Sequence, residues 1–247
     1  MNYKFIINPS YISFQDFLIN IKRYFTDNDT TIHKARNELK IIQFQEISTV
    51  VKSFKIPNII NKIAYTYFRD SKAKKSYNYA LKIEKYTPKP IGYIEFYTNE
   101  LLDESFFISE EFSYDFTIRK PLLDKNFESK DAIFKAFARF TLELHNDGIF
   151  HNDYSPGNIL IKKSSSGYIF KVVDINRMKF MHLDEDMRAK NFAKLWANDT
   201  ILKVIAEEYS KYYHCSPSFE QTVLEYSNKN KKIKNFKKRL KGKPVND

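Results

Sequence analysis

Glycine, cysteine and long apolar runs are all scarce in this chain of 247 residues. The single cysteine, Cys215, cannot form a disulfide within the chain, which is typical of a reducing compartment. No apolar run approaches the roughly 18 residues that a membrane-spanning helix needs. The apolar stretch within residues 1–9 is too short and too interrupted for a signal peptide. These absences favour a cytoplasmic protein that is neither secreted nor embedded in a bilayer.

The composition is that of a globular protein rich in aromatic residues. Apolar residues make up 43% and charged residues 29%, which excludes a disordered or collagen-like chain. With 22 Phe and 17 Tyr, the core is expected to be aromatic. The length allows one large domain or two small ones.

Positive charge is concentrated near the C-terminus. The formal net charge is +11, and residues 229–243 hold nine Lys and Arg with no acid, so the rest of the chain is nearly neutral. Ile233, Phe236 and Leu240 fall on one face of a possible helix. Three interpretations stay open: a solvated end, a contact with an anionic membrane surface, and a nucleic-acid contact, which has the least support.

The first 110 residues read mainly as strands. Residues 39–52 predict two short strands, and residues 92–97 and 105–109 predict two more. Between them, a helix within residues 61–84 is expected to begin at Ser71 as N-cap and to end before Thr87-Pro88-Lys89-Pro90.

The second half reads mainly as helix. Residues 131–147 place Ile133, Phe137, Phe140 and Leu144 on one helical stripe, and Gly148 is suited to ending that helix. Ile149 and Phe150 precede a turn-rich segment that ends in an expected strand at 159–161. A hairpin-like loop at 164–167 and a strand at 168–173 that runs into Asp174 follow. Residues 184–210 are mostly helical by pattern.

The segment from His151 to Asn158 carries the strongest chemical signal. It has the form H-x-D-x-x-x-x-N, and Asp174 follows Asp153 by 21 residues. A carboxylate at 153 can orient a hydroxyl and receive its proton, while an amide and a second carboxylate supply the oxygen ligands that Mg²⁺ prefers. The alternative is that Asp153, Asn158 and Asp174 are ordinary turn residues.

This segment resembles the catalytic loop and metal-binding aspartate of the protein-kinase-like fold. The resemblance implies an α+β, two-lobed chain: a small β-rich N-lobe over 1–110, a larger helical C-lobe over 111–228, and the basic tail over 229–247. It also implies roles for single residues. These are a catalytic Asp153, a loop-organising His151, Mg²⁺ ligands Asn158 and Asp174, a phosphate-binding Lys52, and adenine contacts from backbone groups at Glu110–Phe112.

The sequence departs from the kinase pattern in two places. No glycine precedes Gly92, so a Gly-rich phosphate loop is missing, and His33–Asn37 stands in its place with Arg36 and Asn37 as weak candidates for phosphate contact. The predicted helix carries Lys72, Lys74, Lys75, Ser76 and Asn78 where kinases have a glutamate that pairs with the lysine. Glu84 is the nearest acid beyond them.

The loop is closer to small-molecule kinases than to protein kinases. Ser155 stands where protein kinases usually have lysine, Pro156 follows it, and no A-P-E segment is present. The sequence is most similar to the bacterial lipopolysaccharide kinase family, which phosphorylates Kdo or heptose of the inner core. The matching stretches are VVKSFKIPN (50–58), RDSKAKKSYNYAL (69–81), TPKPIGYIE (87–95), LHNDGIFHNDYSPGNILI (144–161) and VVDINRMKF (172–180).

This second resemblance covers roughly residues 30–195. It implies ATP, Mg²⁺ and a lipid-linked sugar acceptor at the cytoplasmic face of the inner membrane, where the protein would be peripheral. The basic tail at 229–243 is consistent with such a substrate. Two alternatives stay open: a kinase for soluble sugars or aminoglycosides, and a pseudokinase that binds a partner or lipid. For Arg177, contact with acceptor phosphate and simple pinning of the loop are equally plausible.

Overall fold

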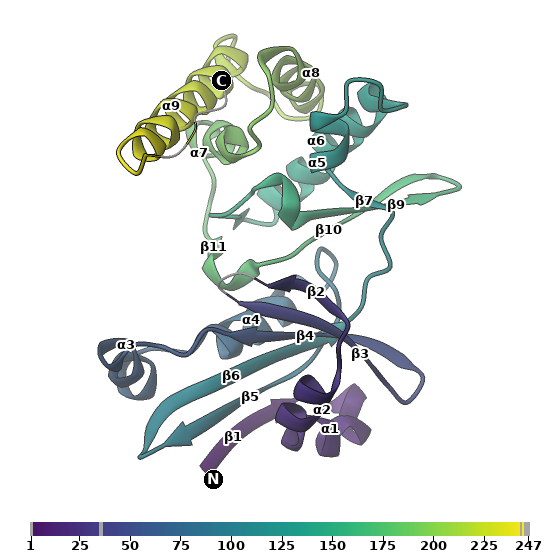
Figure 1. The fold of residues 1–247 in the computed structure, drawn as a ribbon. Helices are drawn as coiled ribbons and strands as arrows, with labels where there is room; N and C mark the ends of the chain where they lie inside the picture. The colour runs from purple at the N-terminus through teal and green to yellow at the C-terminus, as the bar shows by residue number, and fades with distance from the viewer. Residues whose placement is uncertain (1, 35–36, 243, 245–247) are drawn as a thin grey trace. The chain divides into compact units, whose positions relative to one another are not determined.

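The chain forms two compact units. The computed structural model describes residues 2–34, 37–242 and 244, and it divides into residues 1–113 and 114–247 (Figure 1). We refer to these as the first and second units. The lobe boundary expected from the sequence lay at residues 109–113.

The first unit is built on one antiparallel sheet with the strand order β1-β5-β6-β4-β3-β2. The strands expected at 39–52, 92–97 and 105–109 are confirmed as β3 with β4, β5, and β6, whereas β1 and β2 were not predicted. The strands are β1 (Asn2–Ile7), β2 (Thr31–Lys34), β3 (Glu38–Phe44), β4 (Ile47–Phe54), β5 (Pro90–Thr98) and β6 (Leu101–Glu110).

Helices cover both faces of this sheet. The turn η1 (Pro9–Phe14) and the helices α1 (Gln15–Ile19) and α2 (Ile21–Asp27) pack on one face. On the opposite face α4 (Lys72–Lys82) packs through Ala73 and Tyr77 against Phe54 and Tyr93. Ser71 caps α4 as predicted, since its hydroxyl accepts a hydrogen bond from the Lys74 N–H at 3.1 Å. Between β4 and α4 lie α3 (Ile59–Ile63) and η2 (Ala64–Phe68), which the sequence did not predict.

The second unit is mainly helical, as expected. Its helices are α5 (Arg119–Leu123), α6 (Lys130–Asn146), α7 (Glu185–Asn191), α8 (Asp199–Ser210) and α9 (Phe219–Arg239), with short turns η3 (Pro156–Asn158), η4 (Ile175–Arg177) and η5 (Phe192–Lys194). Its strands are β7 (Phe116–Thr117), β8 (Ile149–Phe150), β9 (Ile159–Ser164), β10 (Gly167–Val172) and β11 (Lys179–Phe180).

Helix α6 leads the chain to the predicted catalytic loop. Its buried stripe contains Ile133, Phe137 and Leu144 as expected, and Gly148 ends it with φ of +70°. This left-handed conformation suits glycine. The region expected to be helical at 184–210 is interrupted, because Trp196 adopts φ of +58° between η5 and α8.

The basic tail continues a long helix. Residues 229–239 are the second half of α9, whose first half packs through Phe219, Val223 and Leu224. The predicted apolar stripe of the second half faces solvent, because Ile233, Phe236 and Leu240 are 45%, 61% and 72% exposed. Among the described residues no helix is long and apolar enough to cross a membrane.

Candidate functional site

The H-x-D-x-x-x-x-N segment forms a tight loop between β8 and β9, and Asp174 follows β10. Strands β9 and β10 form a hairpin in which Ile159 is opposite Val172. One step further, the Asn158 carbonyl accepts a hydrogen bond from the Val173 N–H at 3.0 Å. The hairpin therefore brings the loop that contains Asp153 and Asn158 next to Asp174, as the sequence predicted.

His151 ties the two segments together. Its Nε2 lies 3.0 Å from the Val173 carbonyl oxygen, and its Nδ1 accepts a hydrogen bond from the Asp153 N–H at 3.1 Å. This pair of bonds fits a neutral ring protonated at Nε2. Burial lowers the pKa of His151, which favours the same neutral form. The ring is an organising element, in agreement with the role expected for it.

The Asp153 carboxylate points to the surface beside a guanidinium. Its Oδ2 accepts a hydrogen bond from Arg177 Nη2 at 2.9 Å, and the same nitrogen lies 3.8 Å from Asp174 Oδ2. Asp174 has φ of +57° and ψ of +47°, a left-handed conformation that is uncommon outside glycine and that clusters at functional sites. Of the two roles considered for Arg177, the structure displays the loop-pinning contact.

The ligand set around Asp174 suits Mg²⁺ delivered on a nucleotide. The Asn158 amide nitrogen donates to the Asp153 carbonyl at 2.9 Å, which orients the side-chain oxygen away from that bond. Mg²⁺ is typically held by one or two carboxylates together with substrate phosphates and water. Among the described residues, no group of three or more His, Cys, Asp or Glu could hold a metal by itself. Asn158 and Asp174 therefore fit a site that the phosphates complete.

Positive charge gathers around Asp153. Lys194, in η5, donates a hydrogen bond to the Asn152 carbonyl. Burial lowers the pKa of Lys194; Asp153 raises it, and Lys234 and Arg177 lower it further. Lys194 is thus close enough to Asp153, to Arg177 of η4 and to Lys234 of α9 to be influenced by each of them.

A buried polar chain supports this loop from behind. Asn191 donates to the His151 carbonyl at 3.0 Å, and its side-chain oxygen lies 3.0 Å from His145 Nε2. His145 Nδ1 lies 2.9 Å from the Tyr209 hydroxyl, which also accepts from Arg188 at 2.8 Å. Burial lowers the pKa of His145 to about 4, so the chain contains a neutral histidine at pH 7.

The first unit carries the other predicted residues. Lys52 lies on the sheet face that packs against α4, and its Nζ is 5.2 Å from the Phe54 ring centroid. Helix α4 provides no acid; Glu84, just beyond it, raises the pKa of Tyr77 as a secondary contribution after burial.

Two backbone N–H groups of the segment expected to contact adenine, Glu110–Phe112, already form hydrogen bonds within the first unit. The Glu110 N–H donates to Lys89, and the Glu111 N–H donates to Ser48. An adenine ring would therefore be met by other backbone groups of this segment, such as those at Phe112. Of the candidates at the missing Gly-rich loop, Arg36 lies outside the described residues, and the Asn37 side chain accepts a hydrogen bond from the Lys55 N–H at 3.3 Å.

The residues that contact the loop from distant parts of the sequence were not predicted. Lys194 and Asn191 lie within a stretch recognised only as helical, and no spacing rule links them to Asp153. Their polar side chains inside an apolar helical pattern were the only available signal.

The comparisons with known proteins agree with this topology. No protein-family model and no curated protein matches the sequence. The solved structure of WaaP in complex with acyl carrier protein matches with a TM-score of 0.59 and 14% identity, covering 94% of this chain and 99% of that chain. The Rio2 kinase–ADP/Mg²⁺–phosphoaspartate complex from Chaetomium thermophilum matches with a TM-score of 0.47 and 14% identity, over 88% of this chain and 67% of that chain. Together with the order of strands and helices, the WaaP match shows that this chain has the protein-kinase-like fold.

Proposed function

We propose that the protein is an ATP- and Mg²⁺-dependent kinase that transfers the γ-phosphate to a sugar hydroxyl of the lipopolysaccharide inner core. The observation that carries the proposal is the hydrogen-bonded unit formed by His151, which links the Asp153 N–H to the Val173 carbonyl. This unit fixes a carboxylate base beside two oxygen ligands. Phosphoryl transfer depends mainly on such positioning and on charge stabilisation.

Each residue has a role in this proposal. Asp153 orients the attacking hydroxyl and accepts its proton, while Asn158 and Asp174 hold Mg²⁺ on the nucleotide phosphates. Mg²⁺ supplies neutralising charge on the phosphate oxygens. Lys52, together with backbone groups of Glu110–Phe112, binds the nucleotide from the first unit.

The cations around Asp153 support an acceptor that carries negative charge. Arg177 and Lys234 both act electrostatically on Lys194, and such a group is best balanced by an anion bound beside the accepting hydroxyl. A Kdo carboxylate or a phosphate on the inner core would serve. The motif resemblance to lipopolysaccharide kinases points to the same acceptor class.

The second half of α9 supports binding at the surface of an anionic membrane. It combines clustered lysines with an outward stripe of Ile233, Phe236 and Leu240, which is the pattern of an interfacial helix. The lipid-linked acceptor would be met at that surface, and the protein would be peripheral on the inner membrane.

Thermal unfolding with ATP and Mg²⁺ tests the nucleotide site without any acceptor. At a hundredfold excess over the dissociation constant, ligand adds about 2.7 kcal/mol, or roughly 5–10 °C for a chain of this size. We expect this shift in wild type and in Asp199→Asn, and its loss in Asp174→Asn. No shift in wild type would favour the pseudokinase alternative.

Acceptor assays then separate the enzyme classes. We expect transfer from labelled ATP to a Kdo- or heptose-bearing lipid, and little to free sugars or aminoglycosides. Equal activity on soluble acceptors, unchanged by Lys→Gln substitutions in the second half of α9, would instead support a soluble small-molecule kinase.

A further inference from the structure

The segment between β4 and α4 has its polarity reversed relative to an ordinary surface helix. In α3 and η2, the polar residues face the protein. Lys62 pairs with Asp103 of β6, and the Thr66 hydroxyl accepts a hydrogen bond from the Leu102 N–H at 2.9 Å. The Lys62 side chain is only 22% exposed, although lysine is among the residues most often found at the surface.

The opposite side of the segment presents large apolar side chains to solvent. We call this side the α3 apolar patch. Surface helices normally bury such residues, and contiguous exposed apolar side chains mark interaction sites. Its members are Ile56, Ile59, Ile60, Ile63, Tyr67 and Phe68, which are 49%, 61%, 74%, 42%, 62% and 82% exposed.

Specific hydrogen bonds impose this orientation. The Asn58 side-chain oxygen caps α3 by accepting from the Asn61 N–H at 3.0 Å and from the Asn61 side-chain amide at 2.7 Å. The Thr66 hydroxyl also donates to the Lys62 carbonyl at 2.7 Å. The polar side is thus anchored to β6, and the patch cannot turn inward without breaking these bonds.

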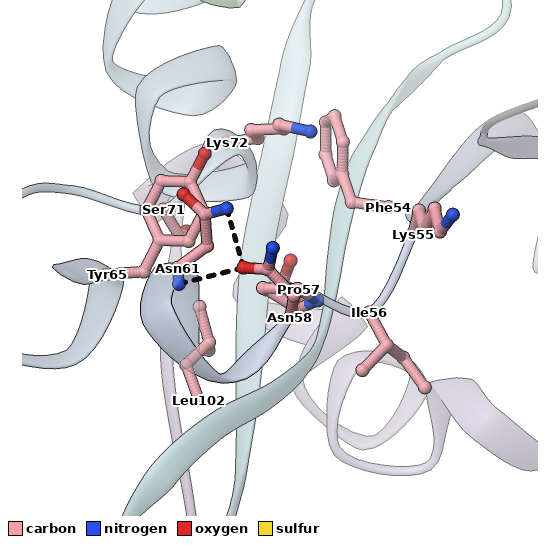
Figure 2. Close-up of a pocket in the computed structure, with 11 residues that line it drawn as sticks. Phe54, Lys55, Ile56, Pro57, Asn58, Asn61, Tyr65, Ser71, Lys72 and Leu102 are labelled. Atoms are coloured by element: carbon pink, nitrogen blue, oxygen red, sulfur yellow. Dashed lines mark hydrogen bonds between the residues drawn. The ribbon is translucent and has the colours of Figure 1, made fainter. Parts of the chain in front are cut away.

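Basic residues are frequent in the part of the chain that contains the patch. Residues 52–75 contain seven Lys and Arg and one Asp, although the chain outside the tail is nearly neutral. A cavity of about 250 Å³ adjoins the segment, and its lining includes Lys55, Lys72, Asn58 and Asn61. Figure 2 shows the hydrogen bonds between Asn58 and Asn61 among the side chains that line this cavity.

We propose that the α3 apolar patch is a membrane contact that inserts into the interface of an anionic bilayer. Its isoleucines, Tyr67 and Phe68 enter the boundary between headgroups and acyl chains, and the flanking lysines bind headgroup phosphates. A nucleic acid would offer no partner for the isoleucines. A protein interface is depleted in lysine at its core, whereas here the exposed Lys55 and Arg69 directly adjoin Ile56 and Phe68 in the chain. The site lies in the first unit, separate from α9, and does not depend on the proposed kinase activity.

Vesicle co-sedimentation tests the contact. The probe is phosphatidylcholine vesicles with about one-third phosphatidylglycerol. Removing two exposed apolar side chains in Ile60→Ser/Phe68→Ser should lower the partition coefficient at least about tenfold. The matched control is Ile12→Ser/Leu123→Ser, which removes side chains of 62% and 76% exposure elsewhere and should bind as wild type.

Salt separates the patch from purely electrostatic binding. In about 1 M NaCl the Debye length is ~3 Å, so binding through lysines alone is lost. A residual fraction of wild type should stay bound, and that fraction should fall sharply in Ile60→Ser/Phe68→Ser. Ile233→Ser/Phe236→Ser, which removes two exposed apolar side chains of α9, should lower this salt-resistant fraction less than Ile60→Ser/Phe68→Ser does.

An environment-sensitive label locates the inserted segment directly. A nitrobenzoxadiazole group attached through Ile60→Cys in a Cys215→Ser background should brighten on vesicles, and the same label at Leu123→Cys should not. Equal binding of the two double variants, an unresponsive label at 60, or no vesicle binding by wild type would overturn the proposal. A concentration-dependent dimer abolished by Ile60→Ser/Phe68→Ser would assign the patch to a second copy instead. ATP-dependent stabilisation, measured in parallel, reports on the kinase proposal separately.

Discussion

At the scale of single residues, backbone hydrogen bonds hold Asp153 in place while its carboxylate stays accessible. Its N–H is held by His151, and its carbonyl accepts from Asn158, while its carboxylate meets the exposed Arg177. A base fixed in this manner can be altered chemically without moving the loop. The variant Asp153→Asn is therefore a clean test of general-base function.

We expect Asp153→Asn to lower the rate of phosphate transfer by about 10²- to 10⁴-fold while keeping the thermal shift with ATP and Mg²⁺. Asp199→Asn, on the exposed start of α8, is the control for removal of one carboxylate. Transfer by Asp153→Asn at near wild-type rate would exclude the assigned role.

Lys194 is the residue that best tests the acceptor's charge. A charged hydrogen bond contributes about 1.5–3 kcal/mol, so Lys194→Gln should raise the KM for an anionic acceptor about tenfold or more. The kcat should change little, because uniform binding is lost rather than transition-state stabilisation. Lys194→Arg should restore most of the affinity, and Lys203→Gln on α8 should have no effect. A fall in kcat alone would mean that Lys194 only supports the Asn152 carbonyl.

At the scale of elements, Gly148 sets the junction between α6 and the catalytic loop. It adopts φ of +70°, and a Cβ there would lie 2.9 Å from the Met181 carbonyl oxygen. Gly148→Ala should lower the free energy of unfolding by more than the ~1–2 kcal/mol of the left-handed conformation alone. Gly242, with φ of +62° and nothing within 4 Å, is the matched control. Urea unfolding followed through Trp196 measures both, and equal losses would show that the close approach is unimportant.

The elements that the sequence predicted are those whose apolar residues follow one period. Helix α6 keeps its stripe through Ile133, Phe137 and Leu144, and β10 runs straight into Asp174. The segment α3–η2 was missed because its polar side faces the protein. An amphipathic pattern predicts that the apolar side of a helix is buried, and in this segment the apolar side is exposed. Strand β1 was missed because its alternation of polar and apolar residues is short: Ile6, on the same face as Asn2 and Lys4, is apolar although it is 46% exposed.

At the scale of the whole molecule, the sequence predicted site residues that lie close together in the chain but not those that packing brings together from distant segments. Asp153, Asn158 and Asp174 could be predicted because a short loop and one hairpin place them, and both are local in sequence. Asn191 and Lys194 reach the loop through packing of η5 and α9, which depends on the complete fold. No residue spacing encodes that packing, so the polar chain behind His151 required the structure.

Acid stability is the property of the whole second unit that follows from this polar chain. Burial lowers the pKa of His145 to about 4, whereas an unfolded histidine has a pKa of about 6.5. Between pH 6.5 and about 4, His145 is therefore protonated in the unfolded chain and neutral in the folded chain. The contribution to stability is complete above that pH and is lost as the pH falls toward 4, by on the order of 3 kcal/mol. Burial also lowers the pKa of His151, which adds with the same sign.

Trp196, the single tryptophan, lies in the same unit and can report this loss in urea unfolding at a series of pH values. His145→Gln should be less stable than wild type at pH 7.5 and should show a shallower decline below pH 6.5, because one of the two buried titrating groups is gone. His182→Gln, at an exposed position, should keep the wild-type slope. An unchanged slope in His145→Gln would mean that His145 accepts a proton in the folded protein, and the assignment of a neutral His145 in the buried polar chain would then be wrong.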